Sequence, residues 1–528
     1  MRTSFCAALI VVGTILPGLL QAQNEVQLTV SVTGANGAPL LELSKADFSL
    51  SDSGKPRAID TFRTTSPATP APPLAANEYT NAPDGAQPGA VFVVLDTIHT
   101  RFVEERDIRE NILRFLARAA QAKRTVCLAI LSKSGLQVYH DYRTSSDVLQ
   151  AALIRMGVRG LQGMTPPAEA SEAETAAEAA RLTAFRKGDR SNPAPLEETL
   201  MQTSVNAPLA MFREVSYAAA GLPNRKSLVW ITNIVPFEIN SKTFQFESPK
   251  ADAPGAAAVA GARSLGVRDV FTEGEVKQLM PLWRQSIRAL FDAGVSVYPV
   301  EAQNSFAAGS GSFTQSRMQT LAQLTGGKAI YGTNDPLAEL LQSSSVGAGY
   351  LLGVSEPASG DTQFHRLQVS LARAGAVVSA PAGYFPLAGS PKSRAGEQLN
   401  FALRSPLMYS GLTFRVRFAG VEDSAGKKKV NLVILVPGDA GVLNESTRTV
   451  DVAVLGLAKD SKDATVGKLN QNTGGQVPPE AVAQIKEFGF QSKLSIEVPS
   501  SGQFTLRIAL YDNQTGRIGS LIAPMAVP

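Results

Sequence analysis

The sequence of 528 residues has few of the residues that most often carry catalysis. It contains two cysteines and three histidines. It also lacks a nucleophile elbow, a Walker loop, a Cys-x-x-Cys pair and an HExxH pattern, which are the motifs that announce common reaction types. These absences favour a protein that is not an enzyme.

An excess of charge of one sign is also missing. The chain has 50 Lys and Arg against 46 Asp and Glu, a net charge of +4. A nucleic-acid binder needs a dense basic stripe, so no nucleic-acid partner is expected. Charged residues make up 18% and aromatic residues 7% of the chain, with 44 Gly and 32 Pro. That composition favours many turns and small-residue linkers over long coiled helices.

Long apolar runs occur only at the start of the chain. A basic start at Arg2 precedes an apolar run from Phe5 to Leu20, and Ala22 offers a small residue for cleavage. The run is short for a bilayer, so it predicts a signal peptide over residues 1–22 rather than a membrane helix. We expect a secreted, periplasmic or cell-envelope protein with no later membrane span. Its mature chain would keep Cys127 alone and form no internal disulfide.

The remaining chain divides by pattern. Residues 25–62 alternate apolar and polar side chains between turn signals, which predicts short strands too few to hold a core alone. Residues 64–89 are rich in Pro, Ala and Thr and indicate an extended linker. Residues 348–386 alternate again, and we expect them to pair with residues 25–62 in a small β-sandwich. Residues 398–528 predict a C-terminal immunoglobulin-like β-sandwich.

Residues 90–347 alternate between strand and helix patterns, which predicts an α/β domain with a parallel, doubly wound, Rossmann-like sheet. Its first strand, VFVVLD, is followed by an amphipathic helix whose acidic start and basic end suit the helix dipole. The predicted fold class is therefore α/β plus all-β.

A polar segment follows that first strand. It reads Asp96-Thr97-Ile98-His99-Thr100, and the carboxyl ends of strands are where open α/β sheets present polar sites. The segment resembles the metal-ion-dependent adhesion motif Asp-x-Ser-x-Ser of von Willebrand factor type A (vWA) domains. Asp96 and Thr100 match its first and third positions, and Ile98 replaces the middle hydroxyl.

Several segments, in order along the chain, resemble the VWFA-related family of secreted acidobacterial proteins. They are ADFSLSDSGKPRAIDTF, VFVVLDTIHT, PNRKSLVWITN, LFDAGVSVYPVEA, LAQLTGGKAIYGTND and FHRLQVSLARAGAVVSAPAGYF. The resemblance covers most of residues 25–386. It implies a Rossmann-like binding module in an exported protein, with no established reaction.

The resemblance also implies a site for Mg²⁺ or Ca²⁺, which bind hard oxygen ligands and leave one position open for an acidic group of a partner. The candidate ligands are Asp96, Thr100, Thr165 and Asn233, with Asn233 at the later acidic position of the family. Ile98 cannot coordinate a metal, so the site is degenerate and the sequence leaves metal binding open. On the alternative interpretation, Asp96 caps the following helix or accepts hydrogen bonds from backbone N–H groups.

Two functions are compatible with these patterns. The first is an exported binding or adhesion module that recognises a protein or surface partner through Asp96, His99, Thr100 and Asn233. The second is a metal-free structural or assembly protein of the cell envelope, in which the β domains make the contacts. The partner, the oligomeric state and the final compartment are not set by the sequence.

Overall fold

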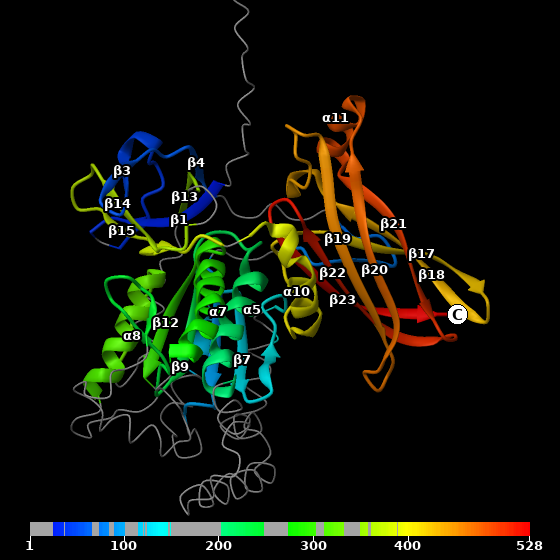
Figure 1. Ribbon diagram of the computed structural model, residues 1–528, viewed down its shortest axis with the longest axis horizontal. Coiled ribbons are helices and arrows are strands. Elements are labelled where there is room, and N and C mark those ends of the chain that lie inside the picture. The colour runs from blue at the N-terminus through cyan, green and yellow to red at the C-terminus, as the bar shows by residue number, and fades with distance from the viewer. Residues whose placement is uncertain are drawn as a thin grey trace, which may run out of the picture.

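The computed structural model has a mixed α/β fold that is rich in strands and contains several sheets (Figure 1). This confirms the coarse fold class predicted from the sequence. The predicted signal peptide and Thr165 lie outside the described residues. The structure describes residues 25–35, 37–65, 73–83, 89–100, 114–119, 121, 124–145, 148, 202–247, 273–301, 311–331, 349–356, 361–387 and 389–528.

A five-stranded sheet in the order β12-β9-β6-β7-β8 forms the centre of the α/β unit. Its strands are β6 (Val91–Asp96), β7 (Val126–Ser132), β8 (Gly135–His140), β9 (Lys226–Thr232) and β12 (Val295–Glu301). All pairs are parallel except β7 with β8, which a two-residue turn joins as a hairpin too short for a parallel crossover. Chain order reverses between β6 and β9, so their carboxyl ends mark the topological switch point.

Helices cover both faces of this sheet. On one face α5 (Ala207–Ala219) packs against α7 (Glu273–Asp292), and α8 (Gly311–Thr325) lies along β12. On the other face, helical residues 114–119 place Phe115 and Leu116 over the strands. Because both faces are covered, the inner strands are buried along their whole length and mostly apolar. A short hairpin of β10 (Glu238–Ile239) and β11 (Phe246–Glu247) lies beside α7 and α8.

Two distant parts of the chain build the small sandwich. Its sheets run β15-β1-β13-β4 and β16-β14-β2-β3. The antiparallel pairs β1–β13 and β2–β14 join residues near 30 and 50 to residues near 350 and 370, because neither half buries enough apolar surface alone. The strands are β1 (Glu25–Thr33), β2 (Phe48–Asp52), β3 (Lys55–Arg57), β4 (Thr61–Thr64), β13 (Gly349–Ser355), β14 (His365–Leu371), β15 (Val377–Ser379) and β16 (Gly383–Tyr384).

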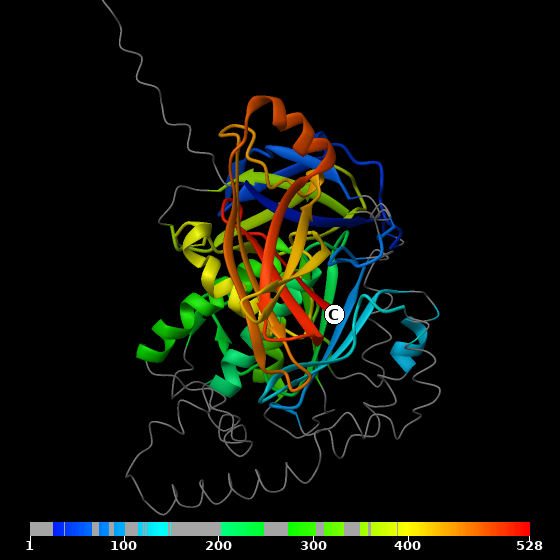
Figure 2. The same ribbon diagram turned by 90° about the vertical axis from the view of Figure 1, so that its right-hand side faces the viewer.

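The C-terminal unit is a sandwich of the sheets β21-β18-β17-β5 and β20-β19-β22-β23. Alternate side chains of β18 are buried, as expected for a strand with one face toward a core. Figure 2 turns this unit toward the viewer, with α11 (Pro479–Phe488) at one end. The strands are β5 (Glu78–Thr80), β17 (Arg415–Ser424), β18 (Lys427–Val436), β19 (Thr449–Lys459), β20 (Thr465–Gln476), β21 (Phe490–Val498), β22 (Gly502–Asp512) and β23 (Ile518–Val527).

The predicted linker over residues 64–89 needs a correction, because it contains β5, which pairs with β17 of the C-terminal sandwich. Asn81, fully buried, fixes this segment. Its side chain donates to the carbonyls of Tyr409 and Leu412 and accepts from the N–H of Phe414. With only three residues, β5 is too short to show the alternation of apolar and polar residues that would predict a strand.

A helix between the predicted units joins the α/β unit to the C-terminal sandwich. The predicted boundary at residue 398 falls inside α10 (Pro391–Arg404), which packs on β19, β22 and β23. From α5, Arg213 lies over the ring of Phe401 in α10. In the described ranges, no helix combines the length and apolar character that a membrane span requires. Short helical turns lie at Lys45–Asp47, Gln202–Asn206 and Gly438–Ala440.

Candidate functional site

Asp96 is the last residue of β6 and lies at the switch point of the sheet. It is 0% exposed. The parallel register of β6 with β9 sets Leu95 opposite Ile231, so Thr232 and the following loop lie beside the carboxylate. An ionised carboxylate buried this deeply is costly unless hydrogen-bond donors surround it.

The protein supplies those donors itself. One carboxylate oxygen of Asp96, Oδ1, accepts the backbone N–H groups of Ile98 at 2.9 Å and His99 at 3.1 Å. The other, Oδ2, contacts His99 Nδ1 at 2.6 Å and accepts the indole N–H of Trp230 at 3.0 Å. The Thr232 hydroxyl lies 3.2 Å from the same oxygen. A carboxylate has about four lone-pair directions, so these contacts fill them.

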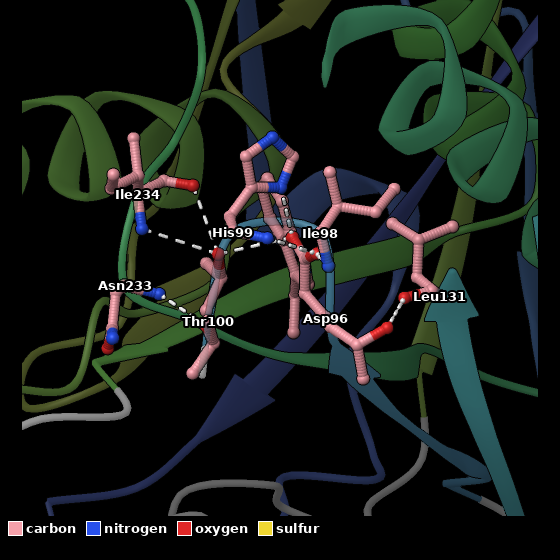
Figure 3. A network of polar contacts seen from close by, with 10 residues as sticks. Asp96, Ile98, His99, Thr100, Leu131, Asn233 and Ile234 are labelled. Carbon is pink, nitrogen blue, oxygen red and sulfur yellow. Dashed lines mark hydrogen bonds and ion pairs between the residues drawn. The ribbon is translucent and has the colours of Figure 1, made fainter. Parts of the chain in front are cut away.

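His99 pairs with Asp96 through Nδ1, and both side chains are fully buried. Because an ionised carboxylate only accepts, Nδ1 carries the proton of this hydrogen bond. The other ring nitrogen, Nε2, is buried, and no residue in the described part of the chain forms a hydrogen bond with it. In Figure 3 the ring extends away from Thr100 and Asn233.

A second contact ties the loop after β6 to the loop after β9. The Thr100 hydroxyl oxygen accepts the backbone N–H of Asn233 at 2.9 Å (Figure 3). Thr232 reinforces the second loop, because its hydroxyl oxygen accepts the backbone N–H of Ile234 at 3.3 Å. The side-chain oxygen of Asn233 is buried and has no hydrogen-bond partner within the described ranges. The two loops of the switch point are therefore fixed relative to each other by Asp96 and by Thr100.

The structure brings four of the predicted site residues together. Asp96, His99 and Thr100 are 0%, 1% and 5% exposed, and Asn233 is half-buried. The side chains of Asp96, His99 and Thr100 thus lie inside the protein. The fifth predicted residue, Thr165, lies outside the described residues.

Sequence reasoning missed Trp230 and Thr232, which both contact Asp96. The available signal was weak: Thr232 is a polar residue that ends an otherwise apolar strand, and Trp230 is two positions before it. Only the adjacency of β6 and β9 turns these residues into partners of Asp96.

Other reactive groups in the described ranges are few. No group of three or more His, Cys, Asp or Glu side chains there is arranged to hold a metal ion. Burial raises the pKa of the Cys127 thiol, which keeps it protonated and unreactive.

Comparison with known proteins assigns no family to this chain. No protein-family model matches it, and no curated protein matches it. Among solved structures, proximal thread matrix protein 1 from the mussel byssus is 12% identical over 49% of this chain and 48% of its own, with a TM-score of 0.25. The pilus adhesin SpaC from Lactobacillus rhamnosus GG, in its open conformation, is 11% identical over 94% of this chain and 57% of its own, with a TM-score of 0.27.

A glycosyl hydrolase family 2 member from Bacteroides cellulosilyticus is 11% identical over 34% of this chain and 20% of its own, with a TM-score of 0.16. The chain thus spans about half the length of the thread matrix protein and one fifth of the hydrolase. At these TM-scores, none of the three structures assigns a function to this chain.

Proposed function

We propose that this protein is an exported, metal-independent binding protein in which a vWA-like α/β domain of the VWFA-related family acts as a scaffold. The observation that carries the proposal is the Asp96 carboxylate, whose lone pairs are all engaged by donors of the protein itself. The strand order and the position of Asp96 at the switch point support the vWA-like assignment.

A divalent cation does not fit this arrangement. Mg²⁺ and Ca²⁺ bind through lone pairs of oxygen ligands. At Asp96 those lone pairs point at N–H and O–H groups, whose positive ends would repel a cation. Ile98 adds an apolar side chain that packs against the core. A cation could enter only by displacing the hydrogen bonds that hold the two loops.

Asp96, His99 and Thr100 then act as positioning residues, and partner contacts fall on exposed surfaces. The β domains offer such surfaces. On β20, Leu469 points into the C-terminal core, while its neighbours Asn470 and Asn472 are exposed and uncharged. We therefore infer that the C-terminal sandwich makes the principal contacts.

A second candidate surface is the carboxyl edge of the α/β sheet around Asn233. Its side-chain oxygen has no hydrogen-bond partner among the described residues, and a buried polar atom of this kind favours a donor from a ligand. On this reading a partner would approach the half-buried Asn233, and the buried Asp96 network would hold the loop in place.

Adsorption of the purified mature chain to cell-envelope preparations distinguishes the two surfaces. We expect saturable adsorption that EDTA does not change, that Asn472→Arg weakens about tenfold and that Asn233→Arg leaves intact. Loss of adsorption in Asn233→Arg alone would place the contact at the carboxyl edge instead. Loss on adding EDTA, restored by Ca²⁺ or Mg²⁺, would refute metal independence.

A further inference from the structure

A cavity of about 170 Å³ lies at the opposite, amino-terminal end of the α/β sheet. It is lined from two units. The small sandwich contributes Ser31 and Thr33 of β1 and Ser379 of β15, and the α/β unit contributes Arg225, Ser227 and Ser296 near the starts of β9 and β12. Figure 1 shows the small sandwich seated over this end of the sheet.

Arg225 joins the two walls of the cavity. Its guanidinium donates to the hydroxyl of Ser379 at 3.0 Å, to the hydroxyl of Ser296 and to the carbonyl of Gly326 at 3.0 Å. All of these acceptors are neutral. Within the described ranges no carboxylate forms an ion pair with Arg225, and burial lowers the pKa of its guanidinium.

Lys226 places a second cationic group at the same end of the sheet. Its side chain is 5% exposed, and its ammonium donates to the carbonyl of Ala293 at 2.8 Å. Burial lowers the pKa of this ammonium to about 7. The described residues that line the cavity include no Asp or Glu. A partly buried guanidinium without a counter-charge is costly, so this end of the sheet favours an anion.

The chemistry of the walls narrows the class of anion. Serine and threonine residues line the cavity from four strands, two in each unit. Donors that converge from several directions match an oxyanion that accepts hydrogen bonds all around, whereas a carboxylate accepts in one plane.

We propose that this cavity binds a tetrahedral oxyanion, phosphate or sulfate, as a free ion or as the end group of a small molecule. Arg225 is its principal charged ligand, and the hydroxyls of both units complete the shell. The site goes beyond the proposed function, because it lies at the other end of the sheet from Asp96. Since both units contribute donors, a bound anion would also stabilise their junction.

Thermal unfolding and calorimetry of the full mature chain test the site, with inorganic phosphate and sulfate as probes and sodium chloride at matched ionic strength as reference. We expect saturable binding at one site and a rise in melting temperature beyond that caused by chloride. Glycerol phosphate separates the two sources: tighter binding than inorganic phosphate indicates an end group, and equal or weaker binding indicates the free ion.

Arg225→Gln should weaken phosphate binding by about tenfold or more, since it removes a charge-assisted donor. The matched control is Arg366→Gln, because Arg366 is another arginine that donates to neutral acceptors, the carbonyls of Ser241 and Lys242, and it does not line the cavity. It should bind phosphate as the wild type does.

Ser379→Asp keeps the test decisive if Arg225→Gln fails to fold, because Ser379 is exposed. The new carboxylate would lie against Arg225, so the melting temperature without phosphate should rise and phosphate binding should be lost. The proposal is overturned if the wild type shows no response beyond chloride, if Arg225→Gln binds with wild-type affinity, or if acetate binds as tightly as phosphate.

Discussion

The two ends of the α/β sheet differ in whether the protein itself compensates their charged groups. At the carboxyl end, the carboxylate of Asp96 is surrounded by donors from its own loop and from β9. At the amino end, Arg225 and Lys226 contact only neutral acceptors among the described residues. We infer that a buried charge whose hydrogen bonds are all made within the protein has a structural role. A charged group without a counter-charge instead indicates a binding site for a ligand.

The largest effect should follow from removing the compensated carboxylate. Asp96→Ala leaves the donors of His99 and Trp230 buried without an acceptor, and we expect a loss of about 3 to 5 kcal/mol in the free energy of unfolding. Urea unfolding of the full chain measures it. As control, Asp423→Ala removes an exposed carboxylate paired with Lys428 and should change stability by less than about 0.5 kcal/mol. Equal stability of the two variants would contradict the role of Asp96.

A second arginine near the amino end sharpens the comparison, because its charge is compensated. Arg288 of α7 pairs with Asp292 at 2.7 Å and with Glu356 at 2.5 Å. Arg288→Gln should lower the free energy of unfolding by about 2 to 4 kcal/mol, since it leaves the largely buried Glu356 without its partner. Arg225→Gln, measured in parallel without phosphate, should cost less than Arg288→Gln. The reverse order would remove the distinction between compensated and uncompensated cations.

The depressed pKa of Lys226 makes the stability of this end depend on pH. Burial lowers the pKa of the folded state to about 7, below the ordinary lysine value of about 10.4. Between these values the unfolded chain binds more protons, so stability should rise with pH across this window. Lys226→Met should raise the free energy of unfolding by about 1 to 3 kcal/mol at pH 6. The stability of this variant should no longer rise with pH across the window. Denaturant unfolding of the wild type and Lys226→Met at several pH values checks this prediction. Parallel curves of stability against pH for the two proteins would refute it.

The smallest effect concerns the second tie between the loops. Thr100→Val preserves shape but removes the acceptor for the Asn233 N–H, and we expect a cost of about 1 to 2 kcal/mol. Asn233→Ala keeps that backbone bond and deletes an amide oxygen that has no partner among the described residues, so it should be neutral within about 0.5 kcal/mol. Denaturant unfolding of both variants measures the difference. A larger loss in Asn233→Ala would show that the amide has a partner in solution.

Part of the carboxyl site could be predicted from the sequence. An apolar strand that ends in Asp96 predicts a polar residue at the sheet edge, and parallel strands bring the segment around Asn233 to the same edge. The burial of Asp96 could not be predicted, because it depends on Trp230 and Thr232, and their role depends on β9 lying beside β6. Sequence patterns predict where strands lie along the chain more readily than which strands are neighbours in a sheet.

The site at the amino end of the sheet was even harder to predict from the sequence. Ser31, Arg225, Ser296 and Ser379 are far apart in sequence, and nothing in their local patterns distinguishes them from other polar residues at strand ends. They meet only because the small sandwich docks on the starts of β9 and β12. Gly294 shows how close that contact is: at φ 62° it turns the chain from α7 into β12, and a Cβ there would lie 2.8 Å from the Thr29 hydroxyl of β1.

The most direct test of the account is a calorimetric titration of the mature protein with Mg²⁺, Ca²⁺ and Mn²⁺, with thermal unfolding followed alongside. If the donors of the protein fill the Asp96 carboxylate, no ion binds saturably and none raises the melting temperature. Saturable binding in the wild type that is lost in a folded Asp96→Asn variant would contradict the account and restore a working metal-ion-dependent site.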